Sequence, residues 1–212
     1  MSGQTRFTQE QIRAFRYWIQ GYQNFYEPLV ASYFCAKGYT VKRPAVVTKS
    51  ELDALAQDLF DGRRKAGAQV SVPAVVQHLR SRKRLQADAL VENSEGVWLV
   101  ECKSWGGFAQ FDEKFVTDTF VRDPRNAAFL LLDRGCGQQL TGKILVLSSP
   151  RNEAVERMLS DIFRTRVQTL CLDEILRDPA VRPAVIAHLE YLDAAVAEVK
   201  QALLPDQGDL TQ

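Results

Sequence analysis

The sequence has few of the residues that bind zinc or act as nucleophiles in hydrolases. Its two histidines, His78 and His188, are isolated from each other, and its four cysteines are far apart along the chain. No pair of cysteines has the spacing of about two to four residues found in zinc knuckles. A zinc site and a Ser-His-Asp triad are therefore both disfavoured. The cysteines are expected to be reduced thiols in the core, and any metal site must use carboxylates.

The sequence also lacks a long hydrophobic run. No stretch approaches the roughly 20 apolar residues of a membrane span, and residues 1–10 do not form a charged-then-apolar signal pattern. We therefore expect a soluble, cytoplasmic protein without a membrane partner. An apolar content of 46% over 212 residues is enough for one substantial core. It predicts a single domain over residues 1–204 and a disordered tail over residues 205–212.

Charge is nearly balanced overall but unevenly distributed. The net charge is +1, yet residues 62–84 contain seven of the 27 basic residues and no acidic residue. This segment predicts a local basic surface on an otherwise acidic body, as phosphate contact requires. A solvated charge run with no ligand is an equally good interpretation. The candidate nucleic-acid-binding residues here are Arg63, Arg64, Lys65, Arg80, Arg82, Lys83 and Arg84.

The order of the predicted elements indicates an α/β fold. Helices are predicted from apolar spacing over residues 8–20, 27–37, 50–60, 111–132, 152–164 and 183–203, with another capped by Ser71. Strands are predicted over residues 39–47, 84–91, 97–104, 143–148 and 167–172. This alternation predicts a mixed sheet of four to five strands flanked by helices. Residues 48–84 form a basic helical insertion after the first strand, and residues 183–204 form a C-terminal helix.

The C-terminal helix has an apolar stripe. Its members are Val185, Leu189, Leu192, Val196 and Val199. The stripe is suited to a homodimer or a partner protein, and it is equally suited to covering the chain's own sheet.

Two strands predicted to form a hairpin bring three charged residues together. If the turn-forming residues 93–96 close the hairpin, then Asp88 lies directly opposite Glu101, because the paired positions share a constant sum. Lys103 lies two residues after Glu101 and therefore on the same strand face. The hairpin thus predicts two carboxylates and one ammonium group at one end of the sheet.

Two opposed carboxylates repel each other unless a cation lies between them. Mg²⁺ fits this position, since it binds one or two carboxylates together with waters and phosphate oxygens, and we expect Mn²⁺ to substitute for it. Asp88 and Glu101 are the candidate metal ligands, and Lys103 would orient a nucleophilic water or stabilise phosphate charge. The acidic-x-Lys pattern occurs three times in the chain, and a purely structural salt bridge is the alternative at this site.

Residues 85–91 (LQADALV) and 101–104 (ECKS) resemble the two-strand signature of the PD-(D/E)xK, or restriction-endonuclease-like, superfamily. Residues 26–30 (YEPLV) and 37–41 (KGYTV) are similar to the first helix and strand of that family, as found in archaeal-type junction resolvases and Mrr-like nucleases. The resemblance implies a restriction-endonuclease-like αβββαβ core. It also implies a metal-site role for Glu27 and DNA cleavage that leaves a 5′-phosphate.

Ser104 and Trp105 follow Lys103 at the predicted mouth of the site. Trp105 can stack on a base or pack under the next helix, and both possibilities stay open. The sequence therefore predicts a metal-dependent deoxyribonuclease acting in DNA repair, recombination or defence against foreign DNA. The alternatives are a catalytically inactive nucleic-acid-binding module and a nuclease-fold subunit of a larger assembly.

Overall fold

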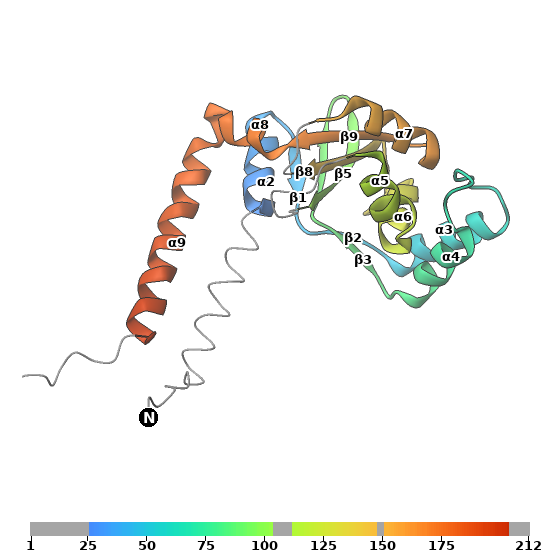
Figure 1. The fold of residues 1–212 in the computed structure, drawn as a ribbon, viewed down its shortest axis with the longest axis horizontal. Coiled ribbons are helices and arrows are strands. Elements are labelled where there is room, and N and C mark those ends of the chain that lie inside the picture. Colours follow the sequence, from blue (N-terminus) through green and yellow to red (C-terminus); the bar gives the residue numbers. More distant parts are fainter. Residues whose placement is uncertain (1–25, 104–111, 148–150, 204–212) are drawn as a thin grey trace, which may run out of the picture.

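A computed structural model describes residues 26–103, 112–147 and 151–203, and it shows an α/β fold with a mixed five-stranded sheet (Figure 1). The strand order is β1–β4–β5–β8–β9. The strands are β1 (Thr40–Lys42), β4 (Ala89–Asn93), β5 (Gly96–Lys103), β8 (Gly142–Leu147) and β9 (Arg166–Cys171). The predicted fold class is therefore confirmed at this level.

The direction of the strands brings several strand ends to one edge of the sheet. β1, β4 and β5 pair antiparallel, whereas β5, β8 and β9 pair parallel. The last residues of β5, β8 and β9 and the first residue of β4 therefore lie at the same edge. The predicted hairpin register is confirmed, because Ala89 pairs with Val100 and Asn93 pairs with Gly96.

Helices cover both faces of the sheet. On one face, Leu90, Leu99 and Leu145 belong to a large hydrophobic cluster. This cluster is completed by α5 (Glu113–Val116), the π-helical turn η1 (Thr117–Val121), α6 (Pro124–Leu131), α7 (Glu153–Phe163) and the insertion. On the other face, Trp98 and Val100 pack beneath α2 (Tyr26–Ala36), α8 (Leu172–Arg177) and the short 3-10 helix η2 (Pro179–Val181).

The predicted insertion is a helical hairpin carried on a two-stranded ribbon. β2 (Ala45–Val47) and β3 (Leu85–Ala87) form the ribbon, which leads to α3 (Lys49–Phe60) and α4 (Val72–Ser81). Apolar side chains of both helices are buried in the larger hydrophobic cluster with the sheet. The insertion is therefore anchored to the core rather than forming a core of its own.

The start of α3 corrects a detail of the sequence prediction. The N-cap is Thr48, whose hydroxyl accepts the Glu51 N–H while the Glu51 carboxylate accepts the Thr48 N–H. This capping box satisfies two backbone donors at once, so the helix begins at Lys49, one residue before the predicted start at residue 50. At α4 the predicted cap, Ser71, is the N-cap residue, although its side chain accepts no capping hydrogen bond.

Two strands predicted to be continuous are interrupted where the ribbon leaves the sheet. The segment predicted over residues 39–47 divides into β1 and β2, and residues 84–91 divide into β3 and β4 at a bend on Asp88. Ala87 packs into the larger cluster, whereas Ala89 packs into the cluster beneath α2. The regular alternation of a strand therefore ends at Asp88, and this residue lies at the junction of the two layers.

Two short segments between the major elements were not predicted. A small hairpin of β6 (Arg134–Gly135) and β7 (Gln138–Gln139) precedes β8, and α8 with η2 follows β9. The predicted helix over residues 111–132 is present from Glu113 as three shorter pieces, and Pro124 begins the last of them. The predicted helix over residues 8–20 and the tail over residues 205–212 lie outside the described residues.

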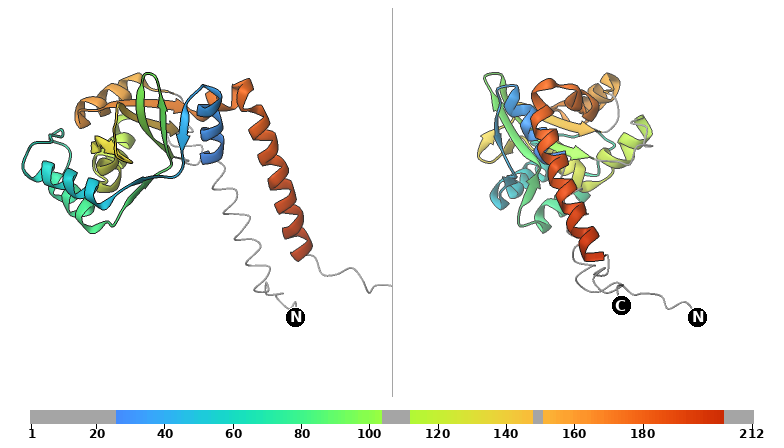
Figure 2. Two further views of the ribbon diagram at one scale, coloured as in Figure 1. Left: turned by 180° about the vertical axis from the view of Figure 1, so that it is seen from behind. Right: turned by 90° about the vertical axis from the view of Figure 1, so that its left-hand side faces the viewer.

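The C-terminal helix α9 (Arg182–Leu203) projects away from the body of the protein (Figures 1 and 2). At a rise of about 1.5 Å per residue, its 22 residues span roughly 33 Å. Of its predicted apolar stripe, Val196 is partly buried, and the other side chains lie outside the described part of the chain. Among the described residues, no helix is both long and apolar enough to cross a membrane.

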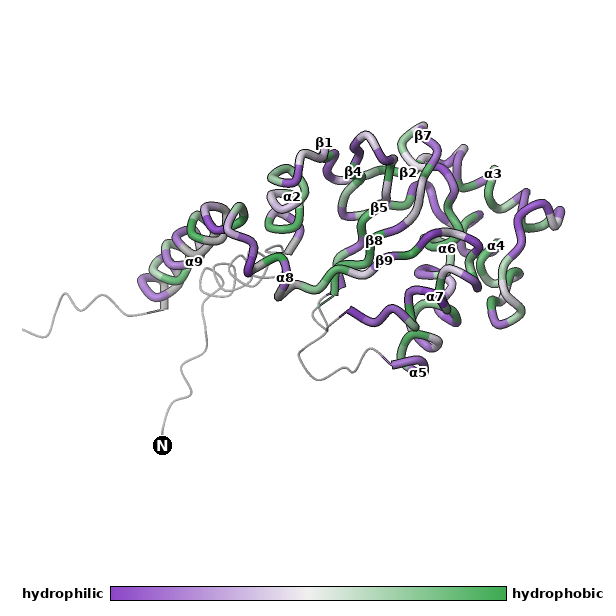
Figure 3. Tube along the Cα trace, turned by 90° about the horizontal axis from the view of Figure 1, so that it is seen from above, coloured by the Kyte–Doolittle hydropathy of each residue, from purple (hydrophilic) through white to green (hydrophobic). Residues whose placement is uncertain are grey.

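The hydropathy of the chain follows these layers. The central strands are mainly hydrophobic and the ends of the insertion mainly hydrophilic (Figure 3). Lys143 is the exception within β8, because its side chain is buried and fully inaccessible to solvent. Its Nζ atom donates to the Leu132 carbonyl at 2.5 Å. Burial, with a further contribution from Arg64, lowers the pKa of Lys143 to about 7.

Lys143 is expected to make the protein more stable as the pH rises from about 7 to about 9. In that window the unfolded chain still holds the lysine proton, whose usual pKa is about 10.4, while the native state has released it. The free energy of unfolding should rise by roughly 1–2 kcal/mol. Lys143→Met should abolish this slope in urea titrations, and Lys65→Met, which removes an exposed lysine, should keep it. An unchanged slope in Lys143→Met would contradict the lowered pKa.

Candidate functional site

Glu101 and Lys103 lie at the end of β5, on the sheet edge where β4 begins. The Lys103 Nζ atom is 2.6 Å from Oε1 of Glu101. The side chain of Glu101 is only 13% exposed and that of Lys103 18%, so the ion pair is shielded from water but still reaches the surface. The predicted proximity of these two side chains is therefore present in the structure.

Asp88 lies at the bend between β3 and β4, in the position that follows the last ladder pair. Its Oδ2 atom accepts the Cys102 N–H at 2.6 Å, which holds the carboxylate against the end of β5. Burial, with a further contribution from the Glu101 carboxylate, raises the pKa of Asp88 to about 7. The Cys102 N–H and Lys103 oppose this shift without overcoming it. Asp88 and Glu101 therefore repel each other in a partly buried place.

This pair of carboxylates suits a divalent cation. A cation beside them would offset both the burial of the Asp88 charge and its repulsion by Glu101, and Mg²⁺ needs only one or two protein carboxylates. Among the described residues no group of three or more His, Cys, Asp or Glu side chains is arranged to hold a metal ion. A resident ion would therefore depend on Asp88 and Glu101, with waters or substrate oxygens completing its coordination.

Glu27 approaches the same site from α2. Its carboxylate contributes to the raised pKa of Asp88, which places it near that residue. Its Oε2 atom, however, is bound by the Arg43 guanidinium at 3.0 Å. Glu27 is therefore an outer carboxylate of the site, held by a cation that the sequence analysis did not identify. The only sequence signal for Arg43 is its position directly after β1, whose last residue pairs with Leu90, two residues after Asp88.

The cysteine predictions are partly corrected. Cys171 is buried and Cys102 and Cys136 are partly buried, but Cys35 is exposed on α2. All four thiols are free, as predicted. Burial, with further contributions from Asp88 and Glu101, raises the pKa of Cys102. Although Cys102 lies between two site residues, its thiol stays protonated and is unsuited to be a nucleophile.

Two residues of the predicted basic surface are used within the fold. Arg63 forms ion pairs with Asp58 at 3.8 Å and with Asp61 at 3.0 Å. The Arg64 guanidinium donates to the Phe163 carbonyl at 3.1 Å, and its Nε atom is buried without a hydrogen-bond partner among the described residues. Arg64 thus anchors the insertion to α7. Its predicted role in nucleic-acid binding stays a prediction.

The other predicted basic residues are exposed on the insertion and its ribbon. They are Lys65, Arg80, Arg82, Lys83 and Arg84. None of them forms an ion pair with a described residue. The last three immediately precede β3, which runs directly to Asp88. Ser104 and Trp105 lie outside the described residues, so their predicted roles are not placed.

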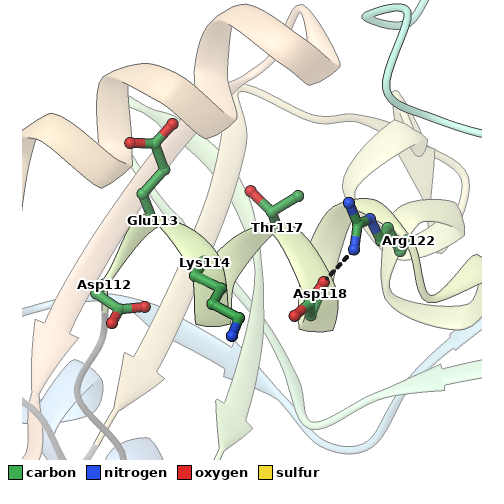
Figure 4. A pocket seen from close by; sticks show the side chains of 6 residues that line it. All are labelled: Asp112, Glu113, Lys114, Thr117, Asp118 and Arg122. Carbon is green, nitrogen blue, oxygen red and sulfur yellow. Dashed lines mark hydrogen bonds and ion pairs between the residues drawn. The ribbon is translucent and has the colours of Figure 1, made fainter.

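A depression of about 560 Å³ over α5 and η1 contains the second acidic-x-Lys match, Asp112 to Lys114 (Figure 4). Asp112 is the N-cap of α5, and its carboxylate accepts the Phe115 N–H at 2.8 Å. Asp118 pairs with Arg122 at 2.6 Å. Asp112 and Asp118 are therefore engaged in local helix contacts, and the Asp88 site is the stronger candidate.

Asp88→Asn is expected to raise the free energy of unfolding at pH 8 by about 1–3 kcal/mol. Between pH about 4 and about 7 the native state retains a proton that unfolded Asp88 has released, so stability contributed by this group falls as the pH rises. The uncharged amide removes this loss. Urea titrations at pH 5 and pH 8 measure the effect, and Asp193→Asn, on the exposed side of α9, is the matched control.

Mg²⁺ should raise the melting temperature of the wild type at pH 8 and leave that of Asp88→Asn nearly unchanged. An equal Mg²⁺ response in both proteins would show that the ion does not bind at Asp88.

Comparison with known proteins adds no assignment to this geometry. No protein-family model, no curated protein and no solved structure matches the chain.

Proposed function

We propose that this chain is a metal-dependent nuclease with a restriction-endonuclease-like core, which hydrolyses phosphodiester bonds of DNA with Mg²⁺ or Mn²⁺. One observation carries the proposal: the mutually repelling carboxylates of Asp88 and Glu101 lie beside the Lys103 ammonium group at a sheet edge. A stabilising salt bridge needs one acid and one base. A second, partly buried carboxylate lowers the stability of the folded state, and it would help to hold a cation.

The side chains divide the work of phosphodiester hydrolysis between them. Asp88 and Glu101 would hold the divalent ion, and such an ion supplies Lewis-acid activation of a phosphate oxygen and of a water. Lys103, 18% exposed, would place its positive charge beside the phosphate or orient the attacking water. The Cys102 N–H fixes the Asp88 carboxylate, and Arg43 restrains Glu27 at the border of the site.

DNA is proposed as the substrate because exposed cations lie just before the strand that leads to the site. Arg82, Lys83 and Arg84 are exposed and precede β3, and β3 ends next to Asp88. A phosphate backbone lying along this strand would meet these cations before it reached the carboxylates. We propose a role in DNA repair, recombination or defence against foreign DNA, with α9 available for a second copy or a partner protein.

Lys103→Ala is expected to reduce the cleavage rate by about 10²–10³-fold, because the positive charge nearest the reacting phosphate is lost. Supercoiled, linear, branched and single-stranded DNA, and RNA, should be incubated with Mg²⁺ or Mn²⁺ and with chelator, and the products resolved on gels. We expect cleavage of at least one DNA form and none with chelator. Lys200→Ala, in the third acidic-x-Lys match, is the control and should cleave normally.

Other outcomes are equally informative. Cleavage that survives both chelator and Lys103→Ala would place the active site elsewhere. DNA binding without cleavage under every condition would favour the non-catalytic binding module. Cleavage of RNA alone would replace the proposed substrate while keeping the proposed site.

A further inference from the structure

Phe60 is a hydrophobic side chain in an unexpectedly exposed place. It ends α3, at the far end of the insertion, and it is 69% exposed, more than any other exposed large hydrophobic residue in the described part of the chain. Its ring is not part of either hydrophobic cluster. The packing of the insertion therefore does not account for an aromatic residue at this position.

Among the described residues, a cation lies against the Phe60 ring. The Arg80 guanidinium of α4 lies over the ring, 5.4 Å from its centroid. Arg80 is itself exposed, and its backbone carbonyl accepts a hydrogen bond from Lys49 at 3.1 Å, which ties the end of α4 to the start of α3. The two helices thus present a flat aromatic ring with a planar cation over it at the surface.

The surrounding charge is positive. The nearby carboxylates of Asp58 and Asp61 share one cation, Arg63, so together these three residues keep a net charge of about −1. Arg80, Arg82, Lys83 and Arg84 are exposed and form no ion pair within the described ranges. A protein surface that bound here through Phe60 would have to cover these cations, whereas a nucleic acid would bind them.

We propose that Phe60 and Arg80 form a stacking platform for an unpaired base, while Arg82, Lys83 and Arg84 bind the phosphates that connect this base to the active site. The inference rests on the proposed nuclease function and specifies its substrate: DNA with an unpaired segment beside the cleaved bond. Aromatic rings and guanidinium planes stack on bases of any sequence, so the platform recognises unpaired DNA without reading its sequence.

The chain also limits the distance between these phosphate-binding cations and the cleaved bond. Arg82 has an extended backbone and precedes Asp88 by six residues, and β3 occupies most of that interval. Six extended residues span at most about 20 Å. At about 3.4 Å per nucleotide, Arg82 therefore lies within about six nucleotides of the scissile phosphate. Because the insertion is packed into the core, Arg82 is held at this distance from the site.

The test is binding by the full-length protein in chelator, measured by fluorescence anisotropy with a duplex carrying a single-stranded overhang of ten nucleotides and with a blunt duplex. Phe60→Ala should weaken binding to the overhang substrate by about 5- to 100-fold and binding to the blunt duplex less than about twofold. Phe60→Trp, which keeps an aromatic ring at this position, should bind the overhang substrate about as tightly as the wild type does. Arg157→Ala, which removes an exposed cation from α7, should bind both substrates as the wild type does.

Equal binding by Phe60→Ala and the wild type would overturn the inference, and so would an equal loss on both substrates. A change of solution mass in Phe60→Ala with unchanged DNA binding would show that the ring contacts a second copy instead. Binding needs no metal, so a selective loss on the overhang supports the platform even if no DNA is ever cleaved. If cleavage occurs, it should fall once the overhang is too short to reach the platform from the active site.

Discussion

The repulsion between the carboxylates of Asp88 and Glu101 is the interaction on which the proposed chemistry depends. Burial of Asp88 beside Glu101 costs stability, as the raised pKa of Asp88 shows. The fold holds the pair by fixing one carboxylate with a backbone N–H of β5 and the other with the Lys103 ammonium group. Two acids held in this way fit the cation proposed for this site, which would offset that cost.

The bend at Asp88 connects this site to the rest of the molecule. At this residue the chain leaves the ribbon that carries α3 and α4, changes strand partners and enters the central sheet. The insertion is buried against the same core as the sheet, so its exposed cations are held at a fixed distance from the carboxylates. One change of direction in the chain therefore positions both the candidate metal ligands and the surface proposed to hold DNA.

Local sequence rules predicted the central hairpin well. The turn over residues 93–96 predicted a register in which Asp88 lies directly opposite Glu101. The structure has this register as far as the pair of Ala89 and Val100, and Asp88 lies at the bend just beyond the ladder. Strand alternation also placed Leu99 and Trp98 on opposite faces, where they are found in separate clusters. These features depend on neighbours in sequence or on one short turn, so a single strand pair was enough to predict them.

The sequence by itself determined the α/β class, the insertion between strands and the grouping of Asp88, Glu101 and Lys103, because periodicity and hairpin register are local. Only the tertiary structure decided that Arg43 holds Glu27 and that Arg64 binds the Phe163 carbonyl. It also decided that Lys143 is buried and that Phe60 is not. These four outcomes depend on which segments distant in sequence pack together, and no local pattern contains that information.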